Sequence, residues 1–165
     1  GIDRETLPER VGALLQKRKL TLGIMESLTG GLLASTVTDM PRSSDYFIGS
    51  LIVCSSELQR QMGVHEETLE QYGTVSEQTA RSMARVARER LGSDIGIGIT
   101  GVAGPDTQEG KPVGTVHIAI DGPDGFVTRM GPGWRSGRLD NKRYSVYSAL
   151  NLLRRYLEGL VEPVQ

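Results

Sequence analysis

The sequence has a single cysteine, few aromatic residues and no long apolar run. One cysteine, Cys54, excludes an internal disulfide bond and a zinc site built from several cysteines. No stretch approaches the roughly 20 apolar residues of a membrane-spanning helix. No apolar core follows residues 1–4, so we do not expect them to form the start of a signal peptide. We therefore expect a cytoplasmic protein without a membrane partner.

The chain also carries almost no net charge. Its formal charge of −1 gives no overall attraction to nucleic acid, and we expect no direct nucleic-acid binding. A local basic patch near the end of the sequence stays open, formed by Arg135, Arg138, Lys142, Arg143, Arg154 and Arg155. With 165 residues, 38% hydrophobic and 24% charged, the composition predicts one globular domain over 1–165.

Hydrophobic periodicity and turn residues predict alternating strands and helices in the first two thirds of the chain, followed by a hairpin. Strands are expected over 21–25, 46–53, 94–100, 113–120 and 125–130, the second of them buried. Helices are expected over 4–18, 32–37, 55–62, 76–91 and 139–160. This order indicates an α/β fold, a three-layer α/β/α arrangement around a mixed sheet of about six strands.

Three loops rich in glycine stand out, at 26–31, 101–106 and 110–115. The first two follow predicted strands, and ligands of open α/β sheets bind beyond the carboxyl ends of strands. Small residues there let a ligand approach the backbone, although each loop alone is equally consistent with a tight turn. None of the loops fits the dinucleotide fingerprint or the Walker pattern.

Taken together, these segments resemble the C-terminal domain family of the competence/damage-inducible protein CinA. The resemblance rests on ESLTGG at 26–31, TGVAGPD at 100–106, KPVGTV at 111–116 and GTVSE at 73–77, with DMPRSS at 39–44 as a weaker match. It runs from about residue 7 to the last helix and is similar to a stand-alone form of the family. It implies hydrolysis of the carboxamide of nicotinamide mononucleotide, without a metal or cofactor, and a homo-oligomer.

The resemblance also assigns site residues. Ser27 matches the family's nucleophile, whereas the residues alone also allow it to be the N-cap of the next helix. An oxyanion or a phosphate would be bound by N–H groups of Thr29, Gly30 and Gly31, facing a wall of Thr100, Gly101 and Gly104. Arg138 and Arg143 fall in a family segment that can clamp a phosphate, or they lie on a solvated helix face.

The chain departs from the family pattern after the second strand. Where the family reads YSNEAK, residues 54–59 read CSSELQ. Cys54 therefore replaces a tyrosine, Ser56 an asparagine and Gln59 the lysine that activates the serine. The segment is one residue shorter before Gly63, and a shifted alignment would put Arg60 in the lysine position. Neither glutamine nor arginine takes up and releases a proton near neutral pH.

Other side chains are candidates for a substitute role. Cys54 is a stronger nucleophile than serine when its pKa is lowered, or it is an inert packing residue. His65 is a candidate base or a helix-capping residue, and His117 is expected on a sheet face. Glu26 and Glu57 flank the site and would act as bases if desolvated. Lys111 matches a family position, so it does not replace the lost lysine.

Two functions of different classes follow. One is an active nicotinamide mononucleotide deamidase that uses Ser27 with a substitute base. The other is a relative with weak or lost activity that keeps the fold and a pyridine-nucleotide cleft, and works as a binding module. The changes at Cys54 and Gln59 favour the second function.

Overall fold

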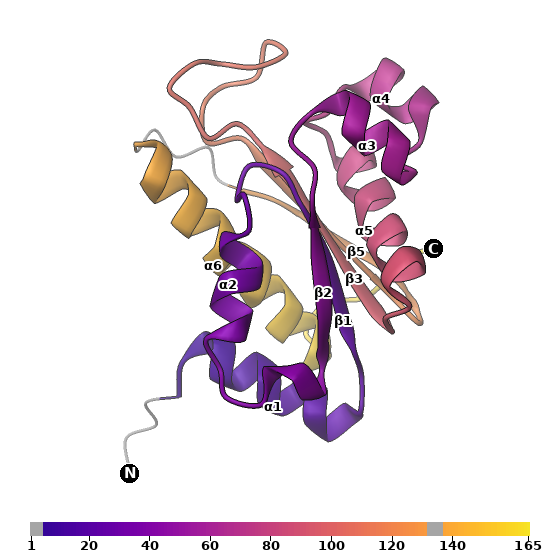
Figure 1. Cartoon of the computed structure of the whole chain (residues 1–165), viewed down its shortest axis with the longest axis vertical. Coiled ribbons are helices and arrows are strands. Elements are labelled where there is room, and N and C mark those ends of the chain that lie inside the picture. Colours follow the sequence, from indigo (N-terminus) through magenta and orange to yellow (C-terminus); the bar gives the residue numbers. More distant parts are fainter. Residues whose placement is uncertain (1–4, 132–136) are drawn as a thin grey trace.

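Five strands form one mixed sheet in the order β2-β1-β3-β4-β5 (Figure 1). The computed structural model describes residues 5–131 and 137–165, so Arg135 of the basic patch lies outside the described residues. Strands β1 (Leu22–Glu26), β2 (Phe47–Ile52) and β3 (Ile95–Gly101) run parallel. Strands β4 (Val116–Gly122) and β5 (Gly125–Met130) complete the sheet as an antiparallel hairpin. The α/β class is confirmed, with five strands in the described residues instead of about six.

Helices cover both faces of this sheet (Figure 1). One face carries α1 (Leu7–Arg18), α2 (Leu32–Thr38) and the long closing helix α6 (Arg138–Leu157). The other carries α5 (Glu77–Leu91), with α3 (Ser56–Met62) and α4 (Glu66–Tyr72) beyond it. A 3₁₀ turn at Ser43–Asp45 leads into β2. Periodicity does not predict α4, because it is short and buries no residue.

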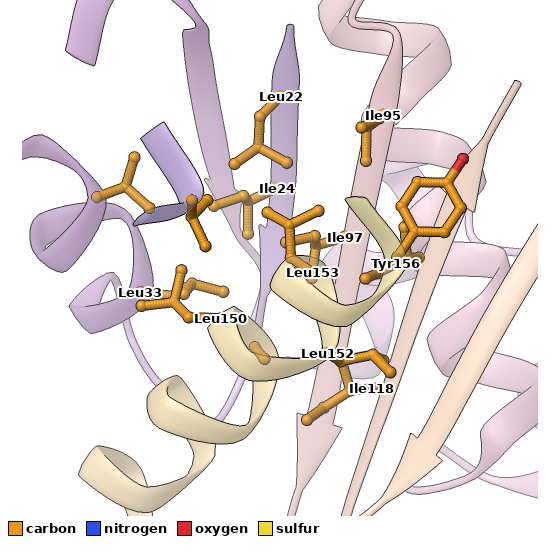
Figure 2. Packing of buried hydrophobic residues seen from close by; sticks show 14 of the residues in the cluster. Leu22, Ile24, Leu33, Ile95, Ile97, Ile118, Leu150, Leu152, Leu153 and Tyr156 are labelled. Atoms are coloured by element: carbon orange, nitrogen blue, oxygen red, sulfur yellow. The ribbon is translucent and has the colours of Figure 1, made fainter. Parts of the chain in front are cut away.

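The main core lies between the sheet and α6 (Figure 2). Leu22 and Ile24 of β1 and Ile97 of β3 are fully buried there against Leu150 and Leu153. Strand β2 differs from the buried strand expected, because it forms the sheet edge and leaves Ile48 49% exposed. The central strands β1 and β3 are thus fixed by packing on both faces, and the loops after them start from rigid positions.

Close packing of α5 on β3 requires glycine at two strand positions. A Cβ atom at Gly98 would lie 2.2 Å from the Ala80 carbonyl oxygen and 2.6 Å from the Ala84 nitrogen. Gly96 meets the same helix in the same way. The backbone of α5 therefore approaches β3 more closely than any side chain on that face would allow.

We predict that Gly98→Ala lowers the free energy of unfolding by about 1–3 kcal/mol, because the added methyl group overpacks a backbone contact. Gly49→Ala is the matched control, since a Cβ atom at Gly49 on β2 meets nothing within 4 Å. Urea unfolding followed by circular dichroism measures both variants. Equal effects at the two positions would contradict this account of the helix–sheet contact.

Candidate functional site

A cleft of about 470 Å³ opens at the carboxyl ends of the parallel strands. The chain leaves β1 toward β2 and leaves β3 toward β4, in opposite directions, which is where open α/β sheets bind ligands. Ser27 and Gly101, which we expected to face one cleft, both line it. The other walls come from the segment after β2, the long loop after β3 and the start of α6.

The turn after β1 is built around a buried carboxylate, Glu26. This side chain is fully buried at the end of β1 and accepts five hydrogen bonds. The donors are the Thr29 hydroxyl at 2.7 Å, the N–H groups of Gly31, Leu33 and Ala34 at 3.0–3.1 Å, and the Ser50 hydroxyl at 2.8 Å. Glu26 therefore caps α2 and ties it to β2, and its oxygens are not available as a base.

This arrangement corrects the role expected for residues 29–31. The Gly31 N–H donates to Glu26 and the Gly30 N–H donates to the Ser27 carbonyl at 3.0 Å, so these groups are engaged inside the protein. Thr29 is fully buried, and of the three residues only Gly30 lines the cleft. The two glycines are needed because their φ angles are +59° and +102°, which other residues rarely adopt.

Ser27 lies on the cleft and is not a helix cap. The N-cap position of α2 is Gly31, so the capping interpretation of Ser27 is wrong. Its hydroxyl lies 3.5 Å from the Ile99 carbonyl oxygen, a weak contact with an acceptor that cannot activate it. The hydroxyl is thus placed for contact with a ligand, but its partner in the described chain is a carbonyl group, not a base.

The segment after β2 forms the wall beside Ser27. Cys54 is exposed, which excludes the packing role, and its thiol lies 3.7 Å from the Ser27 carbonyl oxygen. Gln59 also lines the cleft but is only 1% exposed. Arg60 points to a different set of neighbours, pairing with Glu57 and with Glu66. Of the two residues that the alignment could put in the lysine position, Gln59 lines the cleft and Arg60 does not.

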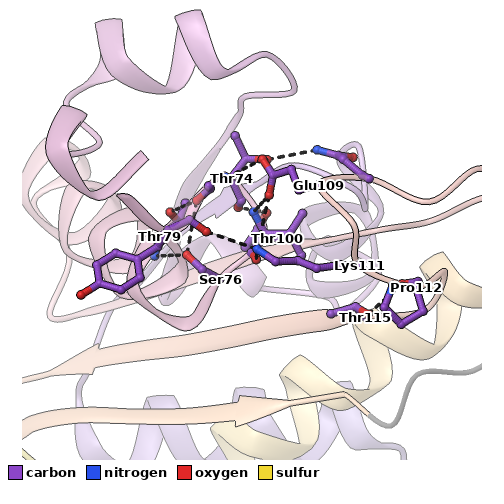
Figure 3. Close-up of polar contacts among 12 residues, drawn as sticks. Thr74, Ser76, Thr79, Thr100, Glu109, Lys111, Pro112 and Thr115 are labelled. Atoms are coloured by element: carbon purple, nitrogen blue, oxygen red, sulfur yellow. Dashed lines mark hydrogen bonds and ion pairs between the residues drawn. The ribbon is translucent and has the colours of Figure 1, made fainter. Parts of the chain in front are cut away.

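The opposite wall is the loop between β3 and β4, and a polar network holds it (Figure 3). Thr100, Gly101 and Gly104 line the cleft as expected. Glu109 accepts hydrogen bonds from the Thr74 N–H and hydroxyl, both at 2.8 Å, and from the Val75 N–H at 3.0 Å. Burial alone would raise the pKa of Glu109, but these bonds and the charge of Lys111 outweigh it and lower the pKa below its usual value.

Lys111 belongs to this network and does not line the cleft. Its ammonium group donates to the carbonyl oxygens of Tyr72 and Val75 and pairs with Glu109 at 3.4 Å (Figure 3). The Thr100 hydroxyl donates to the Thr74 carbonyl oxygen at 2.6 Å. The contacts of Lys111 and Thr100 hold this wall of the cleft against residues 72–75, at the end of α4 and before α5.

The start of α6 supplies the cationic end of the cleft. Arg138 lines it and donates to the Gly104 carbonyl oxygen. Arg143 does not reach it, because its side chain is 72% exposed and pairs with Asp140 at 3.7 Å. Lys142, one helical turn after Arg138, lines the cleft instead and approaches Gly30. The i, i+4 spacing from Arg138 was the signal in the sequence that identifies Lys142.

The histidines do not line the cleft. His65 is the N-cap residue of α4, with its Nδ1 atom 3.4 Å from the Thr68 hydroxyl. His117 lies in β4, where burial and then the charge of Lys111 lower its pKa against the opposing charge of Glu77. The titratable side chains that line the cleft among the described residues are Cys54, Asp106, Arg138 and Lys142.

The described residues contain neither a cluster of metal-binding side chains nor a membrane-spanning helix. Within 5–131 and 137–165, no three histidine, cysteine, aspartate or glutamate side chains gather into a group suited to a metal ion. Across the same residues, none of the helices combines the length and apolar character needed to span a bilayer.

The sequence of the chain is similar to those of known proteins. The family model described as the CinA C-terminal domain matches residues 4–157. A CinA-like protein of Frankia casuarinae is 46% identical, over 94% of this chain and 36% of that protein. A putative competence-damage inducible protein of Halothermothrix orenii is 42% identical, over 96% of this chain and 39% of that protein. The chain thus spans less than half the length of these curated relatives.

Solved structures match the fold over nearly the full chain. The competence/damage inducible protein CihA from Agrobacterium tumefaciens superposes with a TM-score of 0.87 at 32% identity, covering 93% of this chain and 94% of that one. A CinA superfamily protein from Enterobacter cloacae gives 0.88 at 29% identity, covering 95% of each chain.

Proposed function

The chain belongs to the CinA C-terminal domain family, and on that premise we propose that it keeps a pyridine-nucleotide cleft whose deamidase activity is weak or lost. The reaction concerned is hydrolysis of the carboxamide of nicotinamide mononucleotide to nicotinic acid mononucleotide and ammonia. The observation that carries the proposal is that Gln59, which the resemblance aligns with the activating lysine, lines the cleft.

The mechanism of amide hydrolysis explains why a glutamine in place of the lysine would lower the rate. For Ser27 to attack an amide carbon, a base must take its hydroxyl proton and later pass a proton to the leaving ammonia. Gln59 cannot do this, and its NH₂ group is already bonded to the Val53 carbonyl oxygen at 3.1 Å. Loss of the general base typically costs about 10²–10⁴-fold in rate. Ser27 would then contact the carboxamide without being converted into an effective nucleophile.

Binding is supported by parts of the cleft that the substitutions leave in place. A volume of about 470 Å³ suits a mononucleotide. Arg138 and Lys142 at the start of α6 place two positive charges on its rim, where a phosphate would make charge-assisted hydrogen bonds. With the phosphate there, the pyridine ring would extend along the cleft toward Ser27 and Gln59.

We predict that nicotinamide mononucleotide binds the chain and that Lys142→Ala weakens binding about tenfold, since a hydrogen bond to a charged group is worth about 1.5–3 kcal/mol. Arg143→Ala is the matched control, because it removes the same charge from the same helix away from the cleft. Isothermal titration calorimetry measures all three proteins. No heat of binding at millimolar ligand, or equal weakening by both variants, would contradict the proposed cleft.

A second candidate function is an active deamidase in which Lys142 acts as the base. The observation in its favour is that the Lys142 ammonium group approaches Gly30, on the same turn as Ser27. In this case ammonia release by the unmodified chain would be lost in Lys142→Ala and in Ser27→Ala alike. Loss in both, with Arg143→Ala unaffected, would separate this function from the proposed one.

A further inference from the structure

The amide nitrogen of Gln59 has a hydrogen-bond partner, but its amide oxygen has none among the described residues. The side chain is 1% exposed, and its Nε2 atom donates to the Val53 carbonyl oxygen at 3.1 Å. This contact fixes the orientation of the amide, because turning it over would bring two oxygen acceptors together. Its Oε1 atom is buried and has no hydrogen-bond partner among the described residues. A buried acceptor left without a donor is costly and calls for an explanation.

Three side-chain donors that share the cleft with Gln59 contact carbonyl oxygens instead of its Oε1 atom. The Thr100 hydroxyl donates to the Thr74 carbonyl oxygen at 2.6 Å. The Ser27 hydroxyl and the Cys54 thiol contact the carbonyl oxygens of Ile99 and Ser27, respectively. None of these three groups donates to Oε1, so a ligand in the cleft could supply the missing donor.

The position of Gln59 indicates which part of a ligand meets it. Figure 1 shows α3, which carries Gln59, on the opposite side of the strand ends from the start of α6. Arg138 at the start of α6 attracts the anionic end of a ligand, which would direct the other end toward Ser27 and Gln59. In a pyridine mononucleotide, the group at that end is the carboxamide or, in the acid form, the carboxylate.

We propose that Gln59 is a specificity-determining residue whose Oε1 atom accepts an N–H from the ligand carboxamide, so that the cleft selects the amide nucleotide over its acid form. The inference rests on the proposed function and adds to it the selection between the two forms. A carboxamide supplies the missing donor. A carboxylate has only acceptor oxygens, so it would leave Oε1 unpaired and add repulsion between oxygens. The substitution of the lysine therefore turns a catalytic position into a recognition position.

The test compares the two ligand forms on one protein. Calorimetric titration of the full chain with nicotinamide mononucleotide and with nicotinic acid mononucleotide should give at least about tenfold tighter binding of the amide, the effect of one hydrogen bond lost to a buried acceptor. Gln59→Met, similar in size but without polar atoms, should reduce the ratio to near one while the acid form still binds. Gln61→Met is the control, since that exposed side chain on the same helix contacts Glu57.

Each outcome decides the inference. Equal binding of both nucleotides by the unmodified chain would overturn it and leave the proposed function standing, whether or not Gln59→Met folds. An amide preference that survives in Gln59→Met would overturn it as well. No binding of either nucleotide at millimolar concentration would overturn the proposed function and this inference together.

Discussion

Restoring the family's activating segment should raise ammonia release from nicotinamide mononucleotide by about a hundredfold or more, the usual effect of a general base. The variant combines Cys54→Tyr, Ser56→Asn and Gln59→Lys with one residue inserted before Gly63. It returns the lysine to the wall of the cleft beside Ser27. A coupled assay for ammonia measures the gain over the unmodified chain.

Gln59→Lys alone should gain much less. A lysine base must be partly neutral near pH 7, which depends on its surroundings as well as on its burial. Here Cys54 leaves a small exposed thiol where the tyrosine would stand. Helix α3 ends at Gly63, whose φ of +115° fixes the end of the shortened segment. A placement error near 1 Å is enough to cost about a hundredfold in rate.

Ser27→Ala in the restored background is the control for mechanism. Activity that appears with the restored segment and disappears with Ser27→Ala would establish the serine as nucleophile. Restored activity that persists without the Ser27 hydroxyl would contradict the assigned role. A folded, ligand-binding variant that gains nothing would show that the lost segment is not what limits the rate.

The second large effect is expected at Glu26. We predict that Glu26→Gln lowers the free energy of unfolding by about 2–4 kcal/mol, because the amide presents an NH₂ group to donors that need an acceptor, and each buried donor left unpaired costs about 1–3 kcal/mol. Ser50→Ala, which removes one donor of the set, should cost about 1 kcal/mol or less. Glu67→Gln on the exposed surface of α4 is the control for loss of charge.

Chemical unfolding measures the change in the free energy of unfolding for each of the three variants. An effect of Glu26→Gln no larger than that of Glu67→Gln would contradict the description of Glu26 as the cap of α2. The same variant should also weaken nucleotide binding, since the turn that carries Ser27 and Gly30 is held by this carboxylate.

The sequence was sufficient for the layers and for the location of the cleft. Apolar runs predict strands at the five places where they are observed, although about six were expected in all. The loops that follow the parallel strands β1 and β3 must meet at the carboxyl ends of those strands. The edge position of β2 was not predictable from its apolar composition, because a run such as 46–53 has the same appearance at the edge and in the centre. Pairing partners distant in sequence decide which of the two it becomes.

Some of the predicted site residues line the cleft and others do not. Ser27, Gln59, Thr100, Gly101, Gly104 and Arg138 follow from motif positions and line the cleft. Thr29 and Gly31 do not, because a buried glutamate takes up the helix start that a loop motif alone leaves open. Arg143 was expected at the cleft, but Lys142 lines it instead. Which of the two faces the cleft depends on the rotation of α6 about its axis, and the sequence pattern defines this rotation only to within a residue or two.

The central claim is that this cleft binds a pyridine nucleotide without turning it over efficiently. Ammonia release by the unmodified chain, measured beside an active relative that retains the tyrosine and lysine, tests it most directly. We predict a rate no more than about one-hundredth of the relative's, as expected for a missing base. A rate comparable to the relative's, abolished by Ser27→Ala, would contradict the account and require another side chain to serve as the base.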